Sequence, residues 1–185
     1  LRNSDVIVAN APGIAQACVD LGWTKPVRVV SNFAREIDVT PVPRSALSTP
    51  DDAFLVVGSG RFIRRKGFDV LIRAVAQIPD AWLWLVGDGD QREMMENLVK
   101  ELGMEGRTRF TGWVDESMNY VASGSIFVMP SRHEPLGNVI LEAWQTGVPV
   151  VSTRSEGPSW FVKDGEDALF CDIDDVDGTR AAIER

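Results

Sequence analysis

The chain has 185 residues, with 19 lysines and arginines against 27 aspartates and glutamates, and its formal net charge is -8 at pH 7. This length is enough for one globular domain, and the shares of hydrophobic (44%) and charged (25%) residues are ordinary for a folded protein. The composition excludes collagen-like, low-complexity and disordered chains. The net negative charge argues against a nucleic-acid partner, because nucleic-acid phosphates select basic surfaces.

Cysteines, apolar runs and chain ends limit the setting of the protein further. Cys18 and Cys171 are too few and too far apart for a disulfide framework or a metal-binding spacing, so we interpret them as buried or incidental thiols in a reducing compartment. No apolar run approaches the roughly 18 residues of a membrane-spanning helix. The chain starts at Leu1 without Met and stops at Arg185 within a helical pattern, so we expect a fragment of a longer protein.

The first 50 residues form a region of their own. Asp5–Val8 and Val27–Val30 predict two short strands around a helix over Pro12–Leu21. Prolines, serines and a threonine over residues 41–50 then indicate a linker.

From residue 54 onward, short apolar runs alternate with amphipathic helical patterns. Continuous apolar strands separated by helices predict a parallel sheet that is covered on both faces, so the fold class is α/β, with a Rossmann-like, doubly wound sheet of about six strands. In such sheets, ligands bind beyond the carboxyl ends of the strands. The predicted strands cover residues 54–58, 82–86, 109–111, 126–129, 148–152 and 168–170. The predicted helices cover 68–78, 91–102 and 137–146, and a further helix, with Asp115 as its N-cap, runs through Ala122.

The first of these strands leads into a glycine-rich loop with four cations within six residues. Gly60 lets the backbone approach a ligand closely, and Arg61 and Lys66 favour phosphate near a helix N-terminus; a solvated basic loop is the alternative. The dinucleotide-binding fingerprint fails because Ile63 occupies the place of its third glycine. A Walker loop fails because Gly67, rather than Ser or Thr, follows Lys66.

The next strand ends in a glycine turn with two aspartates. Asp88 and Asp90 are a candidate metal-binding pair, but a turn in which Asp90 caps the following helix is the favoured interpretation. The dinucleotide fingerprint that starts at Gly87 also fails, because Arg92 occupies the third glycine position. In the acidic tail, Ile173 occupies the first ligand position of a calcium loop, so that pattern fails as well.

The densest polar stretch is Pro130–Ala143. Glu134 lies in a predicted loop, and Gly137 and Asn138 lie at a predicted helix N-terminus, where free N–H groups attract anions. Glu142 follows Asn138 by one helical turn and shares its face. An exposed helical glutamate is the alternative, but the apolar neighbours of Glu142 disfavour it. Two carboxylates thus bracket an anion site and suit the hydroxyl pairs of a sugar or ribose.

Two further residue types leave their roles open. His133 is the only histidine and adjoins Glu134, which suggests a catalytic pairing, but neighbouring side chains in a loop need not converge. Six tryptophans would suit carbohydrate stacking, yet Trp82 and Trp84 lie within a predicted strand and are expected in the core.

Taken together, these motifs resemble the retaining GT-B glycosyltransferases of family 4, the group 1 transferases. Glu134 and Glu142 reproduce the Glu-X7-Glu spacing of that family, and the loop from Gly60 to Gly67 resembles its phosphate segment. The resemblance extends over about residues 54–172. Two further signatures agree, at residues 85–89 and 110–114.

The resemblance implies that this chain contains one lobe of a GT-B fold. Residues 1–50 would be the end of the N-terminal lobe with the interdomain linker, and residues 51–185 a truncated C-terminal domain that binds a nucleotide sugar. Near the interdomain segment the family usually has Asn-Gly, whereas this chain has Asn32-Phe33.

The resemblance also implies residue roles. Arg61 and Lys66 would hold the diphosphate, with Glu134 at the hydroxyls of the donor sugar; these three are the expected catalytic residues. Glu142 would contact the ribose, and the segment around Trp113 would face the base. The other residues expected to bind the donor are Gly60, Gly87, Leu136, Gly137, Asn138 and Val139.

The implied reaction transfers a sugar from a nucleotide-diphosphate sugar to a hydroxyl of a saccharide or lipid-linked glycan, with retention of anomeric configuration. Cations and helix amides stabilise the leaving diphosphate, so we expect no cofactor and no obligatory metal. The glycan or glycolipid acceptor would bind mainly through the N-terminal lobe, which is largely absent here, so we expect little or no activity from this chain alone.

The family context suggests synthesis of polysaccharide or lipopolysaccharide by a cytoplasmic enzyme, with peripheral contact at the membrane face as a further option. Three alternatives stay open at this stage. They are a nucleotide-sugar hydrolase or epimerase on a GT-B fold, an NAD-dependent oxidoreductase, and a nucleotide-binding module without activity.

Overall fold

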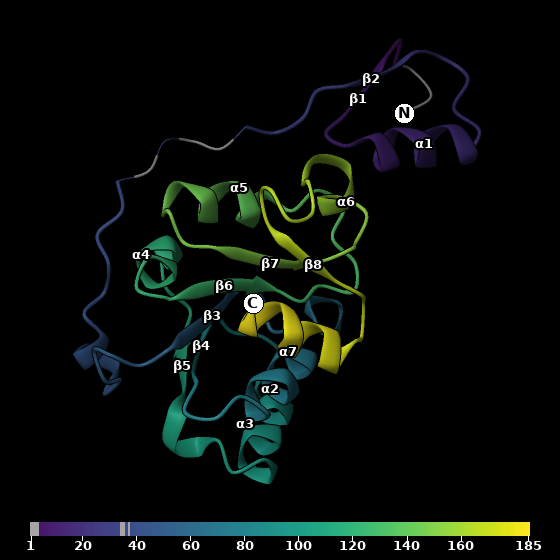
Figure 1. Ribbon diagram of the computed structural model, residues 1–185. Helices are drawn as coiled ribbons and strands as arrows, with labels where there is room; N and C mark the ends of the chain where they lie inside the picture. Colours follow the sequence, from purple (N-terminus) through teal and green to yellow (C-terminus); the bar gives the residue numbers. More distant parts are fainter. Residues whose placement is uncertain (1–3, 34–35, 37) are drawn as a thin grey trace.

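A six-stranded parallel sheet forms the centre of the molecule (Figure 1). The computed structural model describes residues 4–33, 36 and 38–185. The strand order, β5-β4-β3-β6-β7-β8, confirms the predicted α/β class and the count of about six parallel strands. The strands are β3 (Leu55–Ser59), β4 (Trp82–Val86), β5 (Thr108–Gly112), β6 (Ile126–Met129), β7 (Val150–Thr153) and β8 (Leu169–Cys171).

Helices cover both faces of this sheet, which explains why the strands are apolar throughout rather than alternating (Figure 1). One hydrophobic cluster, with Phe62, Leu71 and Val128, lies on the face covered by α2 (Phe68–Ala76), α3 (Arg92–Glu101) and α7 (Val176–Glu184). A second cluster, with Trp84 and Ile140, lies on the opposite face. That face is covered by α4 (Ser117–Val121), α5 (Asn138–Gln145) and α6 (Pro158–Phe161).

The strand order reverses at the centre of the sheet. The chain builds β3, β4 and β5 outward in one direction, and then returns to place β6, β7 and β8 on the other side of β3. The loops that leave the carboxyl ends of β3 and β6 therefore diverge to opposite faces, and they flank a crevice of the kind in which doubly wound folds bind ligands.

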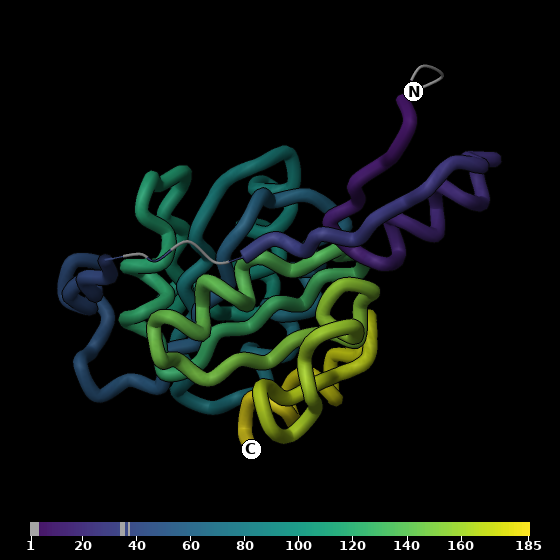
Figure 2. The backbone as a smooth tube through the Cα atoms, turned by 90° about the horizontal axis from the view of Figure 1, so that it is seen from above, coloured from purple at the N-terminus to yellow at the C-terminus, as the bar shows by residue number. Residues whose placement is uncertain are grey.

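The N-terminal region forms a separate small unit that extends from the main sheet (Figure 2). In it, β1 (Ile7–Ala9) pairs in parallel with β2 (Val27–Val29), and α1 (Pro12–Asp20) connects them, as the sequence predicts. Much of its apolar surface is open, including Leu21, which is 89% exposed.

The proline-rich segment that follows is packed rather than free. It contains a short 3-10 helix, η1 (Arg44–Leu47), and apolar side chains of this segment join the cluster on the α4 and α5 face. The Arg44 guanidinium donates to the carbonyls of Asp51, Ala53 and Ser123 at 2.7–3.0 Å. These bonds tie the predicted linker to the main domain.

Some predicted boundaries are wrong by a few residues. Helix α4 begins at Ser117 after Glu116, so Asp115 is not its N-cap. Strand β7 begins at Val150 rather than residue 148, because Pro149 has no N–H to donate to the ladder. The sequence patterns also missed α6, a single turn that begins at Pro158.

The tryptophans in β4 belong to the core, as expected. Trp84 is fully buried, and its indole N–H donates to the Thr49 hydroxyl at 2.9 Å. Trp82 is half-buried beneath the Arg109 guanidinium, which lies 4.9 Å from its ring centre. A buried indole N–H needs such a partner, and Thr49 supplies it to Trp84 from the packed linker.

Gly67 is the place where the two central loops touch. Its φ of 67° is left-handed, and a Cβ at this position would collide with the Pro130 carbonyl oxygen. We therefore predict that Gly67→Ala lowers the free energy of unfolding by about 2–4 kcal/mol, the sum of left-handed strain and overpacking. Urea denaturation followed by circular dichroism measures the loss.

Gly103 provides the matched control. Its φ is 66°, but no atom lies within 4 Å of the place where a Cβ would stand. Gly103→Ala should therefore lower the free energy of unfolding only by the cost of a left-handed alanine, about 1 kcal/mol. Equal losses for the two variants would contradict the claim that the contact with Pro130 excludes a side chain.

Candidate functional site

The residues that the sequence singles out lie in two neighbouring cavities at the carboxyl ends of the strands. The α5 cavity, of about 410 Å³, is lined by Asn10, Lys66, Glu134, Pro135, Leu136, Gly137, Asn138, Val139 and Glu142. The Trp113 cavity, of about 210 Å³, is lined by Ser59, Gly60, Arg61, Val86, Gly87, Trp113, Val114 and Ser117. Every predicted site residue thus lines one of the two.

An ion pair forms the wall of the α5 cavity. The Lys66 ammonium lies 2.6 Å from Glu134 Oε2, and the two side chains are only 18% and 16% exposed. Lys66 is the last residue of the 3-10 helix η2 (Arg64–Lys66), and Glu134 comes from the loop after β6. An ammonium has three N–H donors, so Lys66 can hold Glu134 and still donate to an anionic ligand.

The N-terminus of α5 faces the same cavity. Gly137 is the N-cap, with a left-handed φ of 88°, and its N–H donates to Glu134 Oε1 at 3.3 Å. Among the described residues, no acceptor faces the backbone N–H groups of Asn138 and Val139. These groups and the helix dipole favour a negatively charged ligand at this point.

Glu142 lies in α5 on the border of the α5 cavity. Partial burial raises the pKa of its carboxyl, and the described part of the chain contains no hydrogen-bond or ion-pair partner for it. A partly buried carboxylate without a partner, on the border of a cavity, is a candidate for binding a ligand.

Backbone contacts between loops shape the Trp113 cavity. The Gly60 N–H donates to the Val86 carbonyl at 2.9 Å, and a Cβ on Gly87 would collide with the Gly60 carbonyl oxygen. Arg61 is exposed and forms no ion pair within the described ranges, and Trp113 is 73% exposed. A cation and an aromatic face are thus both available to a ligand here.

The stem of Lys66 stands between the two cavities. A Cβ on Gly60 would lie 3.7 Å from Lys66 Cε, so the lysine side chain runs directly beside the glycine turn. A ligand that occupies both cavities would therefore pass over the lysine. A third cavity, of about 470 Å³, opens at the opposite end of the sheet beside Phe54 and Pro149 and contains none of the predicted residues.

Of the two aspartates after β4, Asp88 rather than Asp90 stabilises the turn, which the sequence did not predict. The Asp88 carboxylate accepts the Gly89 N–H at 2.8 Å and pairs with Arg92 at 3.2 Å. Asp90 does not cap α3, whose N-cap is Gln91 without a side-chain bond, so that prediction is wrong. Arg92, the first residue of α3, holds Asp88 through this ion pair. No cluster of side chains suited to a metal ion occurs in residues 4–33, 36 and 38–185.

His133 pairs with Glu156, not with Glu134. Its Nδ1 lies 2.6 Å from Glu156 Oε1, and Glu156 Oε2 accepts the backbone N–H of Glu134 at 3.3 Å. Burial raises the pKa of Glu156, but its hydrogen bonds and His133 outweigh this and lower the pKa overall. The catalytic pairing of neighbours is therefore absent, and His133 acts on the Glu134 loop through a residue that the motif analysis missed.

The N-terminal unit also contributes to the site. Asn10 follows β1 and lines the α5 cavity, and the side-chain amide of Asn32 donates to Asn138 Oδ1 at 3.2 Å. Sequence reasoning missed Asn10, although its place just beyond a parallel strand is the signal that would have found it.

Comparison with known families then adds to this geometry. The sequence model described as "Glycosyl transferases group 1" matches residues 53–185. The chain belongs to the group 1 glycosyltransferases.

Its relatives in that family include two from Rhizobium meliloti (strain 1021). The lipopolysaccharide core biosynthesis glycosyltransferase LpsE is 53% identical over 184 residues, which cover 100% of this chain and 54% of LpsE. LpsD, described in the same words, is 47% identical over 183 residues, which cover 99% of this chain and 53% of LpsD.

Solved glycosyltransferase-like structures share the fold. Sucrose-phosphate synthase from Thermosynechococcus elongatus superposes with a TM-score of 0.87 at 31% identity, over 100% of this chain and 49% of its own. HepE from Anabaena, solved in complex with UDP and glucose, superposes with a TM-score of 0.88 at 25% identity, over 98% of this chain and 53% of its own. The group 1 chain therefore has the architecture of a GT-B lobe and spans about half the length of these relatives.

The helices of the described part include none that is long and apolar enough to cross a bilayer.

The raised pKa of Glu142 leads to a stability prediction. A carboxyl whose pKa is higher in the folded state stabilises the fold only while it is protonated, and this contribution is lost as pH rises through the folded pKa. Glu142→Gln should therefore stabilise the chain at pH 7 by about 0.5 kcal/mol, the size of a small surface effect.

Urea denaturation of both proteins at pH 7 and at about pH 3.5 measures the difference. Below the pKa of an unfolded glutamate, about 4.3, the wild-type carboxyl is itself neutral and the gain should vanish. A gain that is the same at both pH values would contradict the burial of a charge at Glu142.

Proposed function

We propose that this chain binds a nucleotide-diphosphate sugar and forms the donor-binding part of a glycosyltransferase that retains anomeric configuration, as in family 4. The observation that carries the proposal is the largely buried Lys66–Glu134 ion pair at the open N-terminus of α5. It brings a cation, free amides and a carboxylate, to which we assign the hydroxyls of the donor sugar, around one cavity. HepE, a neighbour in fold, was solved with UDP and with UDP-glucose, which supports a donor of this class.

The donor would lie across both cavities. Its base would face Trp113, its ribose would bind the Glu142 carboxylate, and its diphosphate would lie near Arg61, Lys66 and the first amides of α5. Glu134 would accept hydrogen bonds from the sugar. In this arrangement the diphosphate passes over the stem of Lys66, which lines the α5 cavity and runs beside Gly60 of the Trp113 cavity.

The chemistry needs stabilisation of a leaving group. Breaking the bond between the anomeric carbon and the phosphate oxygen leaves negative charge on the nucleoside diphosphate. Arg61, Lys66 and the amides of Asn138 and Val139 are positioned before the reaction to meet that charge. We therefore propose a reaction without an obligatory divalent metal, in which the acceptor hydroxyl attacks the face from which the nucleotide leaves.

The acceptor would come to this site through the remainder of a longer enzyme. The similarity to LpsE and LpsD supports a sugar or lipid-linked glycan of the lipopolysaccharide core as the acceptor, and the N-terminal unit would form the edge of its binding lobe. Little transfer activity is expected of the 185-residue chain alone. No observation favours the hydrolase, epimerase or oxidoreductase alternatives.

Calorimetric titration with UDP, GDP, ADP and NAD, each with and without EDTA, tests the proposal. We expect metal-independent binding of one nucleoside diphosphate and none of NAD. Binding of NAD alone would overturn the donor assignment, and binding abolished by EDTA would overturn the absence of a metal requirement. Proton NMR of the product from the longer enzyme tests retention, because the anomeric coupling of the new bond must match that of the donor.

Lys66 offers the sharpest single variant. Lys66→Met removes a charge-assisted contact to the diphosphate and should weaken nucleoside diphosphate binding about tenfold or more. Lys100→Met is the control, because Lys100 is exposed on α3 and the substitution changes net charge by the same amount. Equal weakening in both variants would show that only overall charge matters.

A variant of Arg61 distinguishes the binding of the phosphates from the binding of the nucleoside. Arg61→Ala should lower the affinity for the nucleoside diphosphate about fivefold or more while leaving the much weaker affinity for the plain nucleoside unchanged. Titrations of both ligands into both proteins measure this. If the two affinities fall together, Arg61 acts on the base or on the shape of the Trp113 cavity rather than on phosphate.

A further inference from the structure

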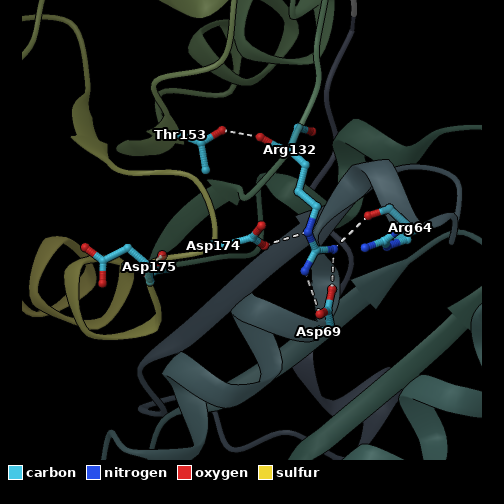
Figure 3. A network of polar contacts seen from close by, with 8 residues as sticks. Arg64, Asp69, Arg132, Thr153, Asp174 and Asp175 are labelled. Carbon is cyan, nitrogen blue, oxygen red and sulfur yellow. Dashed lines mark hydrogen bonds and ion pairs between the residues drawn. The ribbon is translucent and has the colours of Figure 1, made fainter.

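Arg132 lies at the centre of a polar network beside the site (Figure 3). Its guanidinium donates to both carboxylate oxygens of Asp69, at 2.8 and 2.7 Å, to Asp174 Oδ1 at 2.6 Å and to the backbone carbonyl of Arg64 at 2.7 Å. The side chain is only 21% exposed. Neither cavity of the site is lined by Arg132.

This network joins the two segments that carry the ion pair. Arg132 precedes Glu134 by two residues in the loop after β6, and Arg64 precedes Lys66 by two residues in η2. The backbone N–H of Arg132 also donates to the Arg65 carbonyl at 2.8 Å. One arginine therefore holds both segments at a point two residues before each member of the Lys66–Glu134 pair.

Both segments are short or irregular, so contacts with neighbouring elements fix their positions. The helix η2 has only three residues and no side-chain cap, so its geometry is not maintained by internal bonds alone. The loop after β6 is irregular until Asn138. Asp69 lies in the first turn of α2, a regular helix, and gives Arg132 a firm anchor.

Other parts of the network are arranged around Arg132. Thr153 in β7 is buried, and its hydroxyl donates to the Ser131 carbonyl at 2.5 Å, just before the arginine. Asp174 has a left-handed φ of 62°, which is costly for a residue other than glycine. The fold maintains this unfavourable backbone conformation, which places the Asp174 carboxylate against the Arg132 guanidinium.

We propose that Arg132 is a positioning residue, whose guanidinium sets the distance between Lys66 and Glu134 by tying η2 to the loop after β6. A guanidinium has five N–H donors. This one makes four hydrogen bonds within the protein, so it has little donor capacity left for a ligand. Arg132 thus acts on the donor through Lys66 and Glu134. Its importance for sugar transfer rests on the proposed function; its hold on the ion pair does not.

The test measures the Lys66 ammonium directly in the 185-residue chain. Its ¹H–¹⁵N signal is assigned by its loss in Lys66→Arg, and its proton exchange rate with water is measured at pH 6 and low temperature. Arg132→Gln should raise that rate at least about fivefold, because the ammonium loses a fixed acceptor. Arg132→Lys, which keeps the charge but loses the two-pronged contact with Asp69, should give an intermediate rate.

Arg154→Gln is the matched control. Arg154 also pairs with an aspartate, Asp164, at 2.6 Å, but it contacts neither η2 nor the loop after β6. The Lys66 exchange rate should stay unchanged in this variant, and urea denaturation of every variant shows how much each loses in overall stability. If Arg132→Gln does not fold, the Lys66 exchange rate in Arg132→Lys tests the proposal instead, and a wild-type rate there would overturn it.

The outcomes separate positioning from plain stabilisation. A folded Arg132 variant that loses stability but keeps the wild-type Lys66 exchange rate overturns the proposal, and so does a wild-type chain whose Lys66 exchanges as fast as an exposed lysine. A changed exchange rate together with no binding of UDP, GDP or ADP would support the positioning role while overturning the proposed function. The two proposals therefore fail independently.

Discussion

The adjacency of β3 and β6 at the centre of the sheet is the constraint on which the site depends. Because the strand order reverses there, a loop that carries cations and a loop that carries carboxylates end at the same edge of the sheet. Their backbones touch at Gly67 and Pro130, too closely for any side chain at position 67. The Lys66–Glu134 pair exists because these two loops are pressed together.

The same constraint lets an acidic protein present a cationic site. The chain has a net charge of -8, yet four of its cations lie within residues 61–66, in the loop that lines the two cavities. Arg132 is neutralised by Asp69 and Asp174, whereas Arg61 has no such partner in the described part of the chain. Folding thus divides the arginines into those used for structure and those left for a ligand, a division that net charge does not reveal.

Periodicity and glycine placement were enough to predict the sheet and its class. These features are local in sequence: a strand such as β3 is apolar wherever it lies, and Gly137 ends up before a helix because of its neighbours. The rule that ligands bind beyond the carboxyl ends of parallel strands pointed to the loops that line the two cavities, and the family resemblance supplied residues such as Trp113. The errors have two causes. Asp88 rather than Asp90 shapes its turn because Arg92, four residues later, holds it, a contact that the N-cap interpretation did not weigh. His133 meets Glu156, 23 residues away, because the segment before α6 packs against the Glu134 loop, and no spacing rule contains that contact.

The lysine stem between the α5 cavity and the Trp113 cavity has a consequence for inhibitor chemistry. Two small fragments could each occupy one cavity without meeting, because the stem beside Gly60 divides the space. Joining them by a short linker over the lysine would turn the second binding event into an intramolecular one. Affinity would then rise through effective concentration, without any new contact to the protein.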